Sequence, residues 1–127
     1  MKKQKFCMCS HCGNLASLVI NSGPSLSCCG EKMAELVPNT VDASREKHVP
    51  SVTMEAGSII VRVGDVAHPM EEKHYIQFVY VETKSGGQKK SLSAVSDPVV
   101  SFSFAAGDEP VAVYAYCNLH GLWVCEL

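Results

Sequence analysis

Four histidines and one cysteine in the later part of the chain could bind one metal ion together. They are His48, His68, His74, Cys117 and His120. Cys117 and His120 are three residues apart, a spacing that lets a thiolate and an imidazole reach the same ion. A lone histidine is more often a surface or core residue than a ligand. Here the others fall in loops or beside a strand end, where a rigid scaffold presents functional side chains.

The number of donors indicates the kind of metal. Zinc usually takes four protein ligands in a structural site and three plus water in a catalytic one. Five nitrogen and sulfur donors are therefore more than zinc usually binds. A six-coordinate redox metal fits better. A thiolate opposite an open position would push electron density toward a bound molecule. The set therefore predicts electron transfer to a small oxygen species.

A second possible metal site lies near the start of the chain. Its candidate ligands are Cys9, Cys12, Cys28 and Cys29. The first two flank a short turn followed by Gly13, and the last two are adjacent, so four sulfurs could close around zinc or iron. Adjacent cysteines must be bent back to share one ion, which predicts a distorted tetrahedron. Zinc and iron both remain open, and disulfides are a weaker alternative.

Three further residues of metal-binding type are not assigned as ligands. Cys7 could compete with Cys9, but Cys9 has the usual spacing to Cys12, so Cys7 is expected to be a spare thiol. His11 is expected to face solvent. Cys125 is expected to be a buried apolar filler.

The distribution of cysteine and histidine predicts two modules, 1–38 and 39–127, joined by a polar stretch without periodicity. The second module alternates apolar and polar residues in short runs, which predicts an all-β sandwich of seven strands with little helix. Gly86 and Gly87 predict a hairpin, and the segment 107–110 another turn. The predicted strands are 49–55, 58–63, 75–83, 88–95, 99–104, 111–117 and 122–126.

The composition excludes several partners. The 127 residues carry a formal net charge of -2, so neither nucleic acid nor an anionic membrane is expected as the main partner. The basic start is interrupted by cysteines and does not continue as a signal peptide, and no apolar run reaches membrane-spanning length. A cytoplasmic location follows, where cysteines stay reduced and are read first as metal ligands.

Five motifs, spread over the whole length, resemble the desulfoferrodoxins, the two-iron class of superoxide reductase. In the first module they are CSHCGN at 9–14 and CCGEKM at 28–33, which resemble the desulforedoxin domain. In the second module they are EKHVP at 46–50, HPMEEKHYI at 68–76 and CNLHGLW at 117–123, which resemble the neelaredoxin domain.

The resemblance implies two iron ions per chain. One would be held by the four head cysteines, and the other by His48, His68, His74 and His120 as equatorial ligands with Cys117 as the axial thiolate. It further implies that superoxide is reduced to hydrogen peroxide at the sixth position, that Glu46 can occupy that position in the oxidised state, and that Lys47 attracts superoxide and helps protonate the product. An immunoglobulin-like sandwich, a homodimer and rubredoxin as electron donor are also implied.

Two other readings compete with a reductase. A dismutase would use the same site in both directions and release oxygen. A non-catalytic electron-transfer protein, or a binding module stapled by zinc, would have the same head cysteines without the chemistry at the second site.

Overall fold

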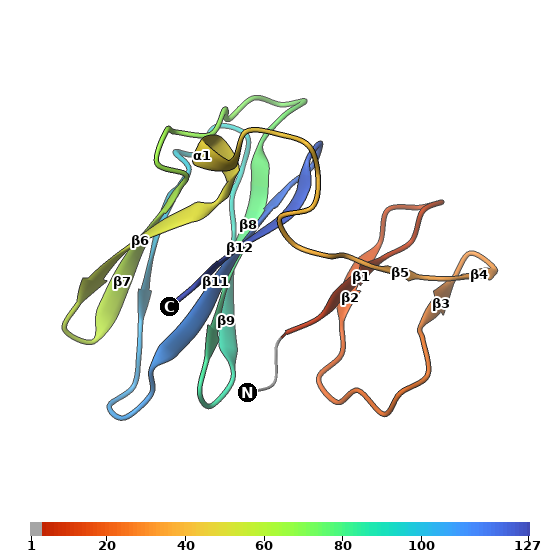
Figure 1. The fold of residues 1–127 in the computed structure, drawn as a ribbon, viewed down its shortest axis with the longest axis horizontal. Helices are drawn as coiled ribbons and strands as arrows, with labels where there is room; N and C mark the ends of the chain where they lie inside the picture. Colours follow the sequence, from red (N-terminus) through yellow and green to blue (C-terminus); the bar gives the residue numbers. More distant parts are fainter. Residues whose placement is uncertain (1–3) are drawn as a thin grey trace. The chain divides into compact units, whose positions relative to one another are not determined.

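The computed structural model describes residues 4–127, and the chain divides into two compact units at Val37 and Pro38 (Figure 1). The unit up to Val37 is called the head below, and Pro38–Leu127 is called the sandwich. Within the described range, no helical segment has the length and hydrophobicity that a membrane crossing requires.

The head is built from five very short strands, in a three-stranded antiparallel sheet of order β2-β1-β5 and a separate hairpin of β3 and β4. They are β1 (Phe6–Met8), β2 (Leu15–Ser17), β3 (Ser27–Cys28), β4 (Glu31–Lys32) and β5 (Ala34–Glu35). Among residues 4–37 only Phe6 and Cys9 are buried. A unit of this size without an apolar core depends on a crosslink or a metal for stability.

Seven strands form the sandwich, in two antiparallel sheets of order β10-β7-β6 and β12-β11-β8-β9. They are β6 (Pro50–Glu55), β7 (Ser58–Val63), β8 (Ile76–Thr83), β9 (Gly87–Ser91), β10 (Val99–Ser103), β11 (Pro110–Cys117) and β12 (Gly121–Glu126). This is an immunoglobulin-like arrangement, with the first, second and fifth strands facing the others. The predicted all-β fold and seven-stranded sandwich are confirmed.

Alternating side chains fill the space between the two sheets. The fully buried core includes Ile59, Val61, Val63, Val79, Val81, Val113, Ala115 and Cys117. In β11, every second residue from Val113 onward belongs to the core between the sheets, as the pleat of a strand requires. The same alternation that buries Val113 and Ala115 therefore brings the sulfur of Cys117 to the inner side at the end of the strand.

Two side chains link β9 and β10, which are edge strands of different sheets. Gln88 Nε2 donates to the carbonyl oxygen of Ser103 at 2.8 Å, and Lys90 Nζ donates to that of Ser101 at 2.5 Å. These bonds occupy carbonyl groups on β10 that would otherwise be open to pairing with another chain.

Two details of the secondary structure differ from the sequence-based prediction. The strand predicted over 88–95 ends at Ser91, because Ser93 and Ser96 form a turn with a 3.1 Å backbone bond and a 2.9 Å hydroxyl contact. A one-turn helix, α1 (Arg45–His48), stands where no helix was expected. Four residues are too few to show helical periodicity.

Candidate metal centres

Three segments meet at one end of the sandwich and carry the histidine–cysteine site (Figure 1). His48 is the last residue of α1, while His68 and His74 lie in the loop between β7 and β8. Cys117 ends β11, and His120 follows in the turn before β12. The structure thus brings together residues that are up to 72 positions apart in the chain.

The four imidazole rings form a closed square. The ring centroids of neighbours are 4.6 Å apart for His48 and His68, 4.7 Å for His68 and His74, and 5.0 Å for both His74–His120 and His120–His48. Neighbouring planes are close to perpendicular, while His48 and His74 face each other across the square at 6.4 Å. The rings therefore surround one common point.

Hydrogen bonds at the outer nitrogens aim lone pairs at that point. His48 Nδ1 lies 2.6 Å from the carbonyl oxygen of Ser44, and His68 Nδ1 lies 2.7 Å from that of Pro69. A carbonyl oxygen only accepts, so both Nδ1 atoms must carry the proton. The two Nε2 atoms are then unprotonated, and their lone pairs face each other across 3.1 Å. Such an arrangement calls for a cation between them.

His74 supplies the same signal independently. Its Nε2 is buried and has no hydrogen-bond partner among the described residues. A buried polar nitrogen without a partner costs free energy, so an orphaned imidazole nitrogen facing two other lone pairs fits a metal ligand.

Burial keeps three of the imidazoles, those of His48, His68 and His74, neutral. Desolvation lowers the pKa of His68 to about 4 and also lowers the pKa values of His48 and His74. These rings are therefore unprotonated at neutral pH, the state a metal ligand requires.

Cys117 and His120 complete the donor set. The sulfur lies 3.9 Å from His120 Nδ1, and the side-chain donor atoms of Cys117, His48, His74 and His120 all lie within 4.8 Å of one another. Burial raises the pKa of Cys117, while the backbone N–H groups of Leu119 and His120 partly offset this by bonding the sulfur. A nearby cation would favour the thiolate further. The site therefore fits a metal held by four imidazoles and one thiolate.

Trp123 supports the ring square from behind. It is fully buried, its Nε1 donates to the carbonyl oxygen of His120 at 3.1 Å, and its ring lies 4.9 Å from that of His48. One side chain thus contacts two of the four histidines.

Glu46 and Lys47 lie on α1 immediately before His48. Glu46 is exposed and Lys47 is half-buried. The charge of Lys47 contributes to the lowered pKa of His48, after burial and the neighbouring imidazoles, so its ammonium is felt at the site. For neither side chain does the structure of residues 4–127 record a hydrogen bond or ion pair to a histidine.

Two residues beside the site were missed by the sequence analysis. Gly64 packs so closely on α1 that an added Cβ would lie 2.6 Å from the carbonyl oxygen of Glu46. Asn118, between Cys117 and His120, bonds the backbone on both sides of His74. The position of Asn118 inside a ligand motif was the one available signal; nothing local marks Gly64.

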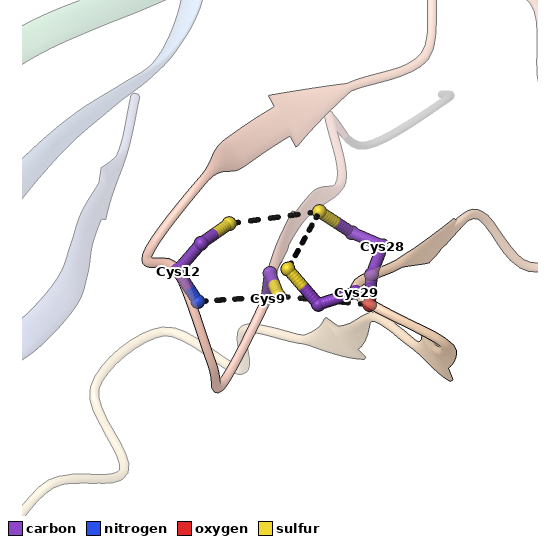
Figure 2. Close-up of side chains that lie close together, drawn as sticks. All are labelled: Cys9, Cys12, Cys28 and Cys29. Atoms are coloured by element: carbon purple, nitrogen blue, oxygen red, sulfur yellow. Dashed lines mark hydrogen bonds between the residues drawn. The ribbon is translucent and has the colours of Figure 1, made fainter.

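The four head cysteines converge in the same way (Figure 2). The sulfur of Cys28 lies 3.6 Å from that of Cys12 and 3.9 Å from that of Cys29. A tetrahedral ion with metal–sulfur bonds of about 2.3 Å requires sulfur–sulfur distances of about 3.8 Å. The observed spacing therefore suits a four-sulfur metal site.

The head backbone bends as the adjacent cysteines require. Cys29 has a φ of 52° and Gly30 a φ of 79°, both in the left-handed region. Because an ordinary side chain seldom takes that conformation, this bend has a cost that metal binding can offset.

The sulfurs of the head differ in acidity. Bonds from the backbone N–H groups of Cys12 and His11 lower the pKa of Cys9 to about 6. Neighbouring sulfurs, Cys12 first, raise the pKa of Cys29 to about 12. Four thiolates at this spacing therefore need a cation.

The remaining candidates lie outside both groups. The sulfur of Cys7 lies 3.5 Å from the carbonyl oxygen of Ala16, and His11 is exposed with its Nε2 3.0 Å from Glu31 Oε2. Cys125, expected to be buried, is only half-buried, because β12 is an edge strand and Cys125 lies near its end.

Comparison with known proteins agrees with this arrangement. The family model described as Desulfoferrodoxin matches residues 40–126. The chain is 44% identical to a desulfoferrodoxin from Syntrophotalea carbinolica over 93% of its own length and 92% of the relative's.

Solved structures extend the likeness to the fold. A superoxide reductase from Treponema pallidum is 35% identical with a TM-score of 0.83, covering 98% of this chain and 100% of that one. A one-iron superoxide reductase from Giardia intestinalis is 33% identical with a TM-score of 0.53, covering 65% of this chain and 99% of the other. With a family match over most of its sequence and both metal-binding groups assembled, the chain belongs to the desulfoferrodoxin family.

Proposed function

We propose that this protein is a superoxide reductase, an oxidoreductase acting on superoxide as acceptor. The observation that carries the proposal is the convergence of four imidazoles and a buried cysteine sulfur on one point. Five such donors are more than zinc usually binds, and they suit iron. Ferrous iron held by these residues would supply the one electron that reduces superoxide to peroxide, and two protons would complete hydrogen peroxide.

Lys47 has two roles in this proposal. Lys47 is half-buried; its ammonium draws the superoxide anion toward the site, and through water it supplies protons to the product. The position of Lys47 directly before His48 on α1 supports these roles. Glu46, one residue earlier, is the carboxylate proposed to occupy the open coordination position in the oxidised state.

The head is the second iron site in this proposal. In the proposal, residues 1–38 are a desulforedoxin-like domain. Its ligands are Cys9, Cys12, Cys28 and Cys29. Residues 39–127 are a neelaredoxin-like domain. The match of the family model to residues 40–126, within the second unit, supports a reaction carried out there. Rubredoxin or a similar protein as electron donor, a homodimer and a cytoplasmic location complete the proposal.

The test combines metal content, optical spectra and oxygen release. Two irons per chain are expected, each with its own thiolate charge-transfer colour when oxidised. Reduced protein should consume superoxide without releasing oxygen. Oxygen release would indicate a dismutase, while zinc at both sites, with no iron accepted at the second, would indicate a zinc-stapled or electron-transfer protein.

A substitution separates the two sites. Cys29→Ser should empty or alter the head site and leave much of the superoxide reduction intact. Loss of all reduction with iron still present at the second site would contradict the separation. Metal analysis of the variant distinguishes the two outcomes.

A further inference from the structure

Asn118 lies in the turn after Cys117 and bonds the chain on both sides of His74. Its Oδ1 accepts a hydrogen bond from the backbone N–H of Tyr75 at 2.9 Å, and its Nδ2 donates to the carbonyl oxygen of Lys73 at 3.0 Å. The backbone N–H of Asn118 also donates to the carbonyl oxygen of Tyr75 at 3.2 Å. The peptide groups flanking one ligand are thus tied to the turn that carries two others.

His74 needs such support more than His48 and His68 do. The rings of His48 and His68 are each fixed by an Nδ1–H bond to a backbone carbonyl oxygen. In the described part of the chain, no hydrogen bond to either ring nitrogen of His74 is recorded, and its Nε2 is buried. Metal-binding histidines are usually oriented by a bond at the outer nitrogen. The orientation of the His74 ring therefore depends on how its backbone is held.

The backbone bonds of His74 itself do not anchor it to the site. Its N–H donates to the carbonyl oxygen of Glu71 at 3.0 Å, and its carbonyl oxygen accepts from the N–H of Glu71 at 2.9 Å. Both bonds lie within the loop and hold it to itself. Besides the β8–β11 ladder, which pairs Cys117 with Ile76, the connection to the Cys117 turn runs through Asn118.

We propose that Asn118 is a positioning residue for His74. Its amide acts like the peptide group of an extra strand and fixes the loop of His74 against the turn of Cys117 and His120. The inference rests on the metal assignment in the proposed function and needs nothing from the superoxide chemistry. Replacing the amide should weaken metal binding by displacing one histidine of four.

Asn118→Asp is the most direct variant because it keeps shape and the acceptor for Tyr75. It places an oxygen against the carbonyl oxygen of Lys73, where Nδ2 donated. Asn39→Asp is the matched control, since Asn39 also brackets a backbone, accepting from Val124 N–H at 2.9 Å and donating to its carbonyl oxygen at 3.1 Å. Both variants lose one amide donor and gain one carboxylate.

The first measurement is the affinity of the full-length, metal-free protein for ferrous iron, by competition with a chelator. Asn118→Asp should lower the affinity of the histidine–cysteine site by about 10- to 100-fold, the usual effect of losing an outer support. The head site should be unchanged in that variant, and both sites unchanged in Asn39→Asp.

The second measurement identifies which ligand moves. In the cobalt-loaded protein, the paramagnetically shifted proton resonances of His74 should change in Asn118→Asp while those of His48 and His68 stay. Asn118→Ala should show the same selectivity and serves if the aspartate variant does not fold. Equal displacement of all histidine resonances, or equal effects of Asn39→Asp, would overturn the positioning role.

The two assignments can fail separately. A parent protein that binds iron at this site, with an Asn118→Asp variant of the same affinity, would refute the role of Asn118 alone. A parent that binds no iron there would overturn both this inference and the proposed function.

Discussion

Replacing Gly64 by alanine should disturb the helix that carries His48. The added Cβ would lie 2.6 Å from the carbonyl oxygen of Glu46, 2.8 Å from that of Val49 and 3.0 Å from the carbonyl carbon of Lys47. All three atoms are backbone, so no side chain can rotate away. Because α1 consists of Arg45–His48, the strain falls on the whole turn.

The size of the effect follows from these distances. A tolerable carbon–oxygen contact is about 3.3 Å, so the backbone at Glu46 must retreat by roughly 0.7 Å. Its carbonyl oxygen is also held by the N–H of Val66 at 3.0 Å, which resists the movement. Overpacking of this kind costs about 1–3 kcal/mol of stability. A misplacement approaching 1 Å at a catalytic site lowers rates by about tenfold or more.

Two assays and one control test the reasoning. Denaturant unfolding of the sandwich should show the loss of stability, and stopped-flow mixing with superoxide should show the slower reaction. Gly86→Ala is the control, because a Cβ at Gly86 meets no heavy atom within 4 Å and neither glycine has a left-handed φ. Should Gly64→Ala match Gly86→Ala in both assays, the contact between Gly64 and α1 does not position His48.

Four further predictions test other parts of the molecule. Lys47→Ala should slow the reaction with superoxide and weaken its dependence on salt while iron stays bound; unchanged stopped-flow kinetics would remove Lys47 from the mechanism. Glu46→Ala should leave the reduction nearly intact but alter the spectrum of the oxidised protein, and an unaltered spectrum would argue against carboxylate ligation. Gln88→Ala should lower the free energy of unfolding by about 0.5–1.5 kcal/mol through loss of the bond to Ser103, without changing the reaction rate; a rate change would point to a wider role. Chelation of both metals should abolish hydrogen-exchange protection in the head and preserve it in β7 and β11, and the idea is wrong if both units lose it together.

The strands and the two groups of candidate metal ligands were predictable because each leaves a local mark. Alternation of apolar residues located the seven strands of the sandwich, since one face of each strand must be buried. Cys117 and His120 can be recognised as candidate ligands from their residue types and their spacing. Their convergence with His48 could be inferred from ligand counting and the family motifs, although the chain brings them together over 72 positions.

The supporting residues left no comparable mark. Gly64 matters because the backbone of α1 passes close to it, and a glycine outside the left-handed region looks like any other in the sequence. Asn118 acts on Lys73 and Tyr75, 45 and 43 residues away, through bonds that depend on how β8 and β11 pair. Long-range backbone contacts of this kind become visible only in three dimensions.

The two metal sites stand in opposite relations to their folds. The head has strands of two or three residues and only Phe6 and Cys9 buried among residues 4–37, so its ligands are held in place chiefly by the ion they bind. The sandwich has an apolar core of its own, and Cys117 is the last inward residue of a core strand. The rings of His48 and His68 are fixed by bonds to backbone carbonyl oxygens, and Trp123 packs on His48 and donates to the backbone of His120, all independently of a metal. Because the apolar core stabilises the sandwich, the fold can hold the lone pairs of His48 Nε2 and His68 Nε2 3.1 Å apart despite their repulsion. This preorganisation lets the site keep its geometry while the charge of a bound ion changes.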